Sequence, residues 1–135
     1  MNQVDTPFSW PIRVYYEDTD AGGIVYHAQY LHFLERARTE WLRQLGFNQV
    51  ELKAQNILFV IRDMNIKWQM PAKLDDELIV VIEQVQVKKA SFTMQQVIYK
   101  NHQVLVKADV TIACLQVESM KPQPLPEAVR IAAST

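Results

Sequence analysis

The sequence has very little of what usually marks a secreted or membrane-spanning protein. Only one cysteine, Cys114, occurs in 135 residues, so no internal disulfide can form and a reducing, cytoplasmic setting is the simpler interpretation. Runs of purely apolar residues, such as Leu78 to Ile82, are far too short to cross a bilayer, and we expect no transmembrane segment. The first residues also lack the charged start and apolar stretch that a signal peptide has.

Charge and motif content exclude further classes of protein. The formal net charge is only −1, so no broad basic field favours binding to nucleic acid or to an anionic membrane. Neither Gly-x-Gly-x-x-Gly nor Gly-Lys-Ser/Thr occurs, which argues against a dinucleotide or phosphate-loop site. Asp18, Asp20 and His27 could be read as metal ligands, but no second histidine or cysteine lies at ligand spacing. We therefore expect no metal and no tightly bound cofactor.

The length of the chain is that of one well-packed unit. A protein of 135 residues buries roughly two-thirds of the surface of its unfolded chain, which is enough for a real core. We expect a single domain over residues 1–135. Its ends are predicted to be a loose lead at 1–11 and a C-terminal tail at 119–135, because prolines there interrupt regular pairing.

One long amphipathic helix organises the remaining sequence. Its apolar residues recur at gaps of four, three, four and four, the spacing of one helical face: Tyr30, Leu34, Ala37, Trp41 and Leu45. The helix should begin within residues 26–29 and end near Leu45, because Gly46 suits a left-handed stop. A short β-favouring run predicts a strand over 12–18, immediately before the turn that contains two adjacent glycines.

Four apolar runs, separated by short turns, follow a connector that extends to about residue 54. They cover residues 57–70, 78–87, 92–99 and 104–117, and the last alternates apolar and polar positions as a half-buried strand does. Turns of three to four residues favour antiparallel hairpins. We therefore predict an α+β fold, in which one central helix is wrapped by a curved antiparallel sheet of about five strands. Because such a sheet has edges, we also expect a homo-oligomer, either a dimer or a tetramer.

Asp18 and Asp20 lie between the predicted strand and the start of the helix. One interpretation is that they serve only as turn or capping residues, which satisfy free backbone N–H groups. The other is that one carboxylate acts as a base or nucleophile beside exposed N–H groups at the helix N-terminus, which would polarise a substrate carbonyl. A carboxylate and such an oxyanion site together suffice for acyl transfer. The residue pattern alone leaves both interpretations open.

The same region carries a family resemblance. Residues 15–27 read YYEDTDAGGIVYH, and Tyr30-Leu31 and residues 35–40, ERARTE, continue the pattern. These segments resemble the signature of the YbgC family, the Tol-Pal-associated acyl-CoA thioesterases in the 4-hydroxybenzoyl-CoA thioesterase branch of the hotdog superfamily. Residues 70–76, MPAKLDD, and 120–122, MKP, are also similar to that family. The resemblance spans most of the chain and implies a hotdog fold.

The resemblance also implies a set of site residues. Asp20 would be the catalytic carboxylate, acting as nucleophile to give a mixed anhydride or as base on a water. The backbone N–H near His27 would polarise the thioester carbonyl, while Asp18 would hold the turn. Independently of the resemblance, the adjacent glycines Gly22 and Gly23 permit a close approach of a ligand, and Tyr26 is expected either to line the pocket or to pack.

Further residues have two possible uses each. Lys88 and Lys89 are either a solvated hairpin turn or contacts for coenzyme A or phosphopantetheine phosphates, as basic residues are in related hotdog proteins. Some hotdog thioesterases carry their carboxylate on the central helix, where Glu35 lies, but its neighbours Arg36 and Arg38 favour an ion pair. Aromatic residues could line an acyl pocket or pack in the core: Trp68, Phe92 and Tyr99. Core packing is the expectation for Cys114.

Three functions fit this pattern. The leading one is hydrolysis of the thioester of acyl-CoA, or of an acyl group on acyl carrier protein, to the free acid and thiol. A hotdog hydratase is a second, although its familiar motif separates aspartate and histidine by five residues, whereas Asp20 and His27 are seven apart. The third is a non-catalytic partner of acyl carrier protein or of an envelope complex, which the Tol-Pal association of the family suggests.

Overall fold

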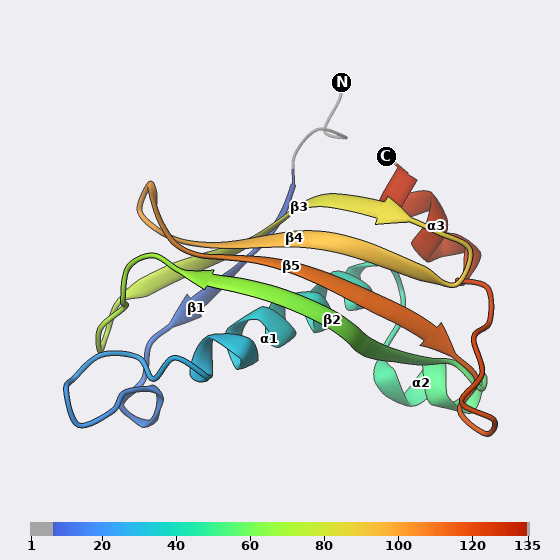
Figure 1. Ribbon diagram of the computed structural model, residues 1–135, viewed down its shortest axis with the longest axis horizontal. Helices are drawn as coiled ribbons and strands as arrows, with labels where there is room; N and C mark the ends of the chain where they lie inside the picture. The colour runs from blue at the N-terminus through green and yellow to red at the C-terminus, as the bar shows by residue number, and fades with distance from the viewer. Residues whose placement is uncertain (1–6, 135) are drawn as a thin grey trace.

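The computed structural model describes residues 7–134, which form a five-stranded sheet and several helical segments (Figure 1). In chain order these are β1 (Phe8–Arg13), the 3₁₀ helix η2 (Tyr16–Asp18), α1 (Gln29–Gln44), α2 (Gln49–Ala54), β2 (Leu58–Trp68), β3 (Glu77–Val87), β4 (Ser91–Lys100), β5 (Gln103–Leu115) and α3 (Glu127–Ser134). The strands are antiparallel and lie in the order β1-β3-β4-β5-β2. None of the helices in this part of the chain has the length and apolar character that a bilayer crossing requires.

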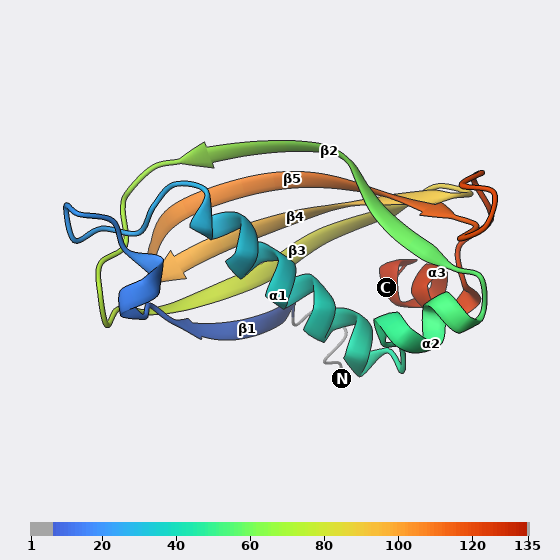
Figure 2. The ribbon, with the colours of Figure 1, turned by 90° about the horizontal axis from the view of Figure 1, so that it is seen from below.

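Helix α1 lies across the inner face of the curved sheet (Figure 2). Its predicted apolar stripe is confirmed, since Tyr30, Leu34, Ala37 and Trp41 are all buried. Phe33, which lies beside the stripe, is fully buried as well. The predicted bounds of the helix also agree with the structure, and Gly46, with φ of 95°, has the left-handed conformation expected just after its end. The fold is therefore a sheet wrapped around one helix, as the sequence predicted.

The first strand differs from its prediction. It spans Phe8–Arg13 instead of 12–18, so residues 8–11 belong to the sheet and are not a loose lead; residues 1–6 lie outside the described part. Pro11 is tolerated because β1 is an edge strand that pairs only with β3. The strand ends before residue 18 because the Asp18 carboxylate accepts a hydrogen bond from the Tyr15 N–H, at 2.8 Å, and closes the turn of η2.

Two helices occur where none was predicted. Helix α2 lies in the region interpreted as a connector, and its Asn48 cap accepts a hydrogen bond from the Glu51 N–H at 2.9 Å. Helix α3 lies in the predicted tail and begins directly after Pro126, a residue that suits the first turn of a helix. Leu125 and Val129 from this segment are buried in the core, so the C-terminal segment helps to close one end of the sheet.

Candidate active site

The turn that carries Asp20 is held by its own backbone. The Asp20 N–H donates to the Ile24 carbonyl at 2.9 Å, and the Gly23 N–H donates to the Asp20 carbonyl at 3.0 Å. Gly23 has a φ of 83°, a conformation that favours glycine over residues with a side chain. The Gly22 N–H donates to Asp20 Oδ1 at 2.8 Å, which leaves Oδ2 without a partner among the described residues. Asp20 is exposed, so one carboxylate oxygen is open to a ligand.

The start of α1 provides the second part of the site. Gln29 is its first residue, and Ala28 at the cap position offers no side-chain acceptor. Within residues 7–134 neither the His27 N–H nor the Ala28 N–H has a hydrogen-bond acceptor. Unpaired N–H groups at a helix N-terminus carry partial positive charge and attract a carbonyl oxygen or an anion.

Asp20 and His27 line the same cavity, which has a volume of about 270 Å³. The other residues that line it come from the turn, from α1 and from the end of β2 and the segment after it: Ile24, Val25, Tyr30, Trp68, Gln69, Met70 and Pro71. A carboxylate with a free oxygen therefore shares one open space with His27, whose N–H is unpaired, and the unpaired N–H of Ala28 belongs to the next residue along the chain. This arrangement could attack or hydrate a carbonyl carbon while its oxygen is polarised.

Trp68 fixes one wall of this cavity. Its indole Nε1–H donates to the His27 carbonyl at 3.0 Å, and the two rings meet edge to face with centroids 6.0 Å apart. Trp68 was predicted either to line a pocket or to pack in the core. It is 47% exposed and lines the cavity, so it has the first of these roles. Tyr26 also packs against the His27 ring, with centroids 4.5 Å apart, and is not among the residues that line the cavity.

Tyr30 closes the cavity toward the core. Its hydroxyl accepts a hydrogen bond from the Ala72 N–H at 2.9 Å, which holds the segment after β2 against the helix. Burial raises the pKa of the Tyr30 hydroxyl, and the charge of Asp76 acts in the same direction, so the phenol remains neutral near pH 7.

Asp18 has the structural role that the sequence predicted. Only 3% of its surface is exposed, and its two carboxylate oxygens accept from the Tyr15 N–H at 2.8 Å and from Gln29 Nε2 at 2.7 Å. Its backbone carbonyl also accepts from the Tyr26 N–H, at 3.1 Å. The two aspartates of the turn therefore have different environments, with Asp18 buried and fully bonded and Asp20 open.

Lys88 and Lys89 lie far from this cavity within one chain. They form the exposed turn between β3 and β4, at the end of the sheet where α3 lies, whereas the Asp20 turn is at the opposite end (Figures 1 and 2). The Lys89 carbonyl accepts from the Leu125 N–H at 3.1 Å, so this turn is joined to the segment before α3. One chain alone does not bring these lysines to Asp20.

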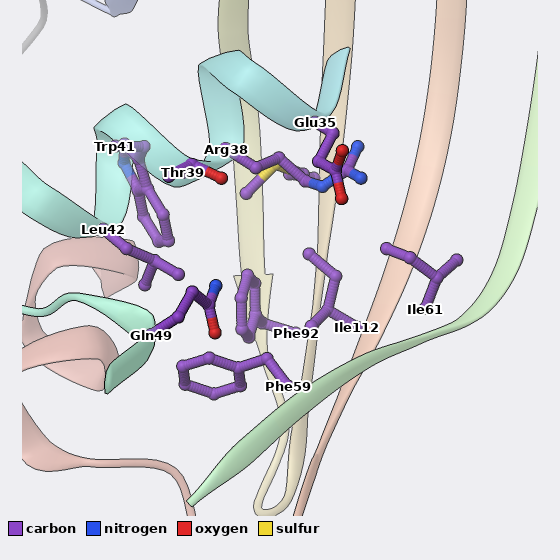
Figure 3. Close-up of a pocket in the computed structure, with 11 residues that line it drawn as sticks. Glu35, Arg38, Thr39, Trp41, Leu42, Gln49, Phe59, Ile61, Phe92 and Ile112 are labelled. Atoms are coloured by element: carbon purple, nitrogen blue, oxygen red, sulfur yellow. The ribbon is translucent and has the colours of Figure 1, made fainter. Parts of the chain in front are cut away.

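A second cavity, of about 110 Å³, lies farther along α1 (Figure 3). Side chains from α1, α2 and three strands line it: Glu35, Arg38, Thr39, Trp41, Leu42, Gln49, Phe59, Ile61, Phe92, Met94 and Ile112. Phe92 is buried and packs on Trp41 and Phe59, with ring centroids 5.7 and 5.8 Å away. Most of the wall is therefore apolar, and the polar groups come chiefly from α1.

The ion pair expected for Glu35 is absent from the described residues. Arg38 instead donates from Nη1 to Gln96 Oε1 at 2.9 Å, and Gln96, which is fully buried, donates to the Leu34 carbonyl at 3.0 Å. Burial lowers the pKa of Arg38, and the charge of Glu35 opposes that shift. Arg36 lies over the Phe33 ring, 5.7 Å from its centroid.

Known proteins resemble this chain over nearly its whole length. Residues 14–132 match the family described as the thioesterase-like superfamily. "Acyl-CoA thioesterase YbgC" of Haemophilus influenzae is 49% identical over 130 residues, which cover 96% of each chain. "Acyl-CoA thioester hydrolase YbgC" of Escherichia coli is 44% identical over 125 residues, 92% of this chain and 93% of that one. The structure of a "Probable Thioesterase from Bartonella henselae" superposes with a TM-score of 0.83 at 40% identity, covering 90% of this chain and 100% of that one.

Proposed function

Because the chain belongs to the thioesterase-like superfamily, and within it to the YbgC acyl-CoA thioesterases with their hotdog fold, we propose that it hydrolyses acyl-CoA thioesters. The products would be the free acid and the thiol of coenzyme A. The observation that carries the proposal is the shared cavity, which is lined both by Asp20, with its open carboxylate, and by His27, with its unpaired N–H.

In the proposed reaction the thioester carbonyl oxygen accepts from the His27 N–H while Asp20 acts on the carbonyl carbon or on water. As a nucleophile, an Asp20 oxygen bonds to that carbon, the C–S bond breaks, and the thiolate takes a proton; water then hydrolyses the mixed anhydride. As a base, Asp20 takes a proton from the water that attacks, and the thiolate again leaves and is protonated. An oriented N–H donor contributes about 10²–10³ in rate, and a positioned base about 10²–10⁴.

The His27 side chain has a smaller part in this proposal than its backbone. Its carbonyl accepts a hydrogen bond from Trp68 and its ring contacts both Tyr26 and Trp68, so these two neighbours fix the residue whose N–H would polarise the substrate. We assign Gly23 to the turn that presents Asp20, because its positive φ allows the backbone to fold back there.

The acyl chain would extend between α1 and β2 toward the second cavity (Figure 3). Both cavities are lined by these two elements, by Tyr30 and Trp68 in the first and by Glu35 and Ile61 in the second. Along the helix axis Glu35 lies about 9 Å beyond Gln29, the first residue of α1, from a rise of about 1.5 Å per residue. The apolar wall of the second cavity suits the methylene groups of an acyl chain.

We also propose that the enzyme works as a homo-oligomer. β2 is an edge strand of eleven residues, and most of its side chains are exposed or half-exposed, which suits pairing with a second copy. In such an oligomer Lys88 and Lys89 of one subunit would reach the phosphates of the substrate bound at Asp20 of another. Coenzyme A and acyl carrier protein present the same phosphopantetheine thioester, so acyl carrier protein is included as a possible carrier.

The test is thiol release, followed with a disulfide dye, over a panel of short, long and aromatic acyl-CoAs. Asp20→Asn should lower kcat/KM by at least about a hundredfold, because the amide is neither nucleophile nor base. Glu17→Gln is the matched control, since it makes the same carboxylate-to-amide change three residues away and Glu17 does not line the Asp20 cavity. It should retain the activity of the wild type.

Each other outcome has a defined meaning. Activity that survives in Asp20→Asn would contradict the assigned carboxylate and leave the hydrolysis itself intact. Hydration of crotonyl-CoA without thiol release would replace the thioesterase proposal with a hydratase. Wild-type protein that is inactive on every acyl-CoA and on acyl carrier protein thioesters would favour the non-catalytic binding role.

A further inference from the structure

Asp18 holds three neighbouring parts of the chain, two through its carboxylate and one through its backbone carbonyl. Its Oδ2 accepts from the N–H of Tyr15, which caps η2, and its Oδ1 accepts from the side-chain amide of Gln29. Its own backbone carbonyl accepts from the Tyr26 N–H. Because only 3% of Asp18 is exposed, water competes little for these bonds.

The bonded segments are the ones that hold the two halves of the candidate site. Asp20 follows Asp18 by two residues, and Gln29 is the first residue of α1, two residues after His27. The link between Asp18 and Gln29 is the shortest of the three side-chain and backbone contacts, at 2.7 Å. A change in this contact alters where the helix start lies relative to the turn.

We propose that Gln29 is a positioning residue for catalysis, which acts through Asp18 to set the distance between the Asp20 carboxylate and the His27 N–H. This inference rests on the proposed thioesterase activity. A displacement of about 1 Å in such a site can lower a rate about a hundredfold. The contact therefore affects kcat more than substrate affinity, because Gln29 and Asp18 do not line the cavity themselves.

The inference is testable because, in the contact between Asp18 and Gln29, the carboxylate only accepts and the amide donates. Both partners of the Asp18 carboxylate are donors, the Tyr15 N–H and the Gln29 amide. Gln29→Glu places a second carboxylate against the first and breaks the contact by charge repulsion. Asp18→Asn added to that variant restores it, because the new amide accepts from Tyr15 and donates to the introduced carboxylate. Asp18→Asn alone should keep the contact, since the Gln29 amide can turn and accept.

The experiment measures kcat and KM for thiol release from an acyl-CoA that the wild type hydrolyses. At pH 8 Gln29→Glu should lose about ten- to a hundredfold in kcat with KM little changed, and Asp18→Asn/Gln29→Glu should return to within about threefold of the wild type. Gln44→Glu is the matched control, because it is the same change at an exposed position at the other end of α1. It should keep wild-type kinetics.

A pH profile adds a readout that a purely structural contact would not give. Two carboxyl groups in contact raise the pKa of one of them, so its proton returns as the pH falls from 8 toward 6 and re-forms a hydrogen bond. The kcat of Gln29→Glu relative to the wild type should rise over that range. The other charged groups that line the outer side of Asp18 are Arg13, Glu17 and Arg36.

Thermal unfolding of every variant checks that the protein is folded. A negative charge at a helix N-terminus is favourable, which offsets part of the cost of Gln29→Glu. If that variant does not fold, Gln29→Met replaces it, because it removes the amide donor at similar length and should lose kcat in the same way. Wild-type kcat in Gln29→Glu or Gln29→Met, or a double variant as impaired as Gln29→Glu, would overturn the inference. Failure of the proposed function would be distinguished from failure of this inference, because the wild type itself would then release no thiol.

Discussion

Two aspartates only two residues apart divide structure and chemistry between them. Asp18 is buried with both carboxylate oxygens bonded, so a change that removes either bond alters the backbone of the turn or of the helix start. Asp20 is exposed and uses one oxygen on its own turn, which leaves the other for a ligand. The sequence alone predicted this division only through the family resemblance, because either aspartate could have been the cap. The difference in burial supplies the physical reason.

Cys114 shows a simpler effect of burial. Its side chain is fully buried on β5, its thiol donates to the Pro124 carbonyl at 3.7 Å, and burial raises its pKa from the ordinary 9.0 to about 11. Core packing, which was expected for this residue, is confirmed. Because the thiolate is the reactive form, the native thiol should react very slowly with a disulfide dye at pH 8.

The prediction for Cys114 has two parts. Native protein should release far less than one equivalent of dye per chain, whereas protein unfolded in urea should release one equivalent per chain. Cys114 therefore adds no background to the thioesterase assay, which uses native protein. The pKa of Cys114 is higher in the folded protein than in the unfolded chain. Its contribution to the free energy of unfolding is therefore fully present below pH 9 and is lost as the pH rises through about 11. Cys114→Ala should show a smaller fall in urea midpoint between pH 8 and pH 11; an equal fall would contradict the assignment.

At the scale of elements, the parts with strong periodicity were predicted well. The helix stripe follows from a repeat of 3.6 residues, the last strand from a repeat of two, and the three strands before it from apolar runs bounded by turns; the positions of β2 to β5 agree with these predictions within a few residues. The errors lie in short elements. β1 was displaced because prolines were taken to exclude a strand, although an edge strand tolerates Pro11. α2 was missed although Asn48 and Glu51 have the spacing of a capping box.

Helix α2 is short enough for its cap to decide its stability. Asn48→Ala removes the side chain that accepts from the Glu51 N–H and should lower the free energy of unfolding by about 1 kcal/mol. Urea unfolding followed by circular dichroism measures this loss. Gln55→Ala, at the other end of α2, is the control and should have a much smaller effect. An unchanged urea midpoint in Asn48→Ala would mean that packing of Leu52, and not the cap, holds the helix.

The cavity beside Asp20 depends on contacts between distant elements, and these were the least predictable from the sequence. Trp68 ends β2, forty-one residues after His27, and only the crossing of strand and helix brings its indole to the His27 carbonyl. Its local pattern suited a core residue equally well. The same holds for Gln96, a strand residue whose full burial is explained by its bonds to Arg38 and to α1. Local periodicity carries no information about such pairs.

For the whole molecule, the main question is how two ends of the sheet serve one reaction. The Asp20 turn lies at one end and Lys88 and Lys89 lie at the other (Figures 1 and 2). If these lysines bind substrate phosphates, they must come from a second subunit. Pairing along the exposed edge of β2 in an antiparallel sense reverses the direction of the partner, which would bring its opposite end toward the Asp20 turn.

This arrangement predicts that two inactive or impaired variants complement each other. Lys88→Gln/Lys89→Gln should raise KM for acyl-CoA, with a smaller effect at high salt, because phosphate contacts are screened. When subunits of this variant are mixed with Asp20→Asn and allowed to exchange, half of the dimers are mixed and each has one intact site. At substrate concentrations below KM, mixing should restore about a quarter of the wild-type activity. Activity of the mixture equal to the average of the two separate variants would mean that the lysines and Asp20 do not share a site across subunits.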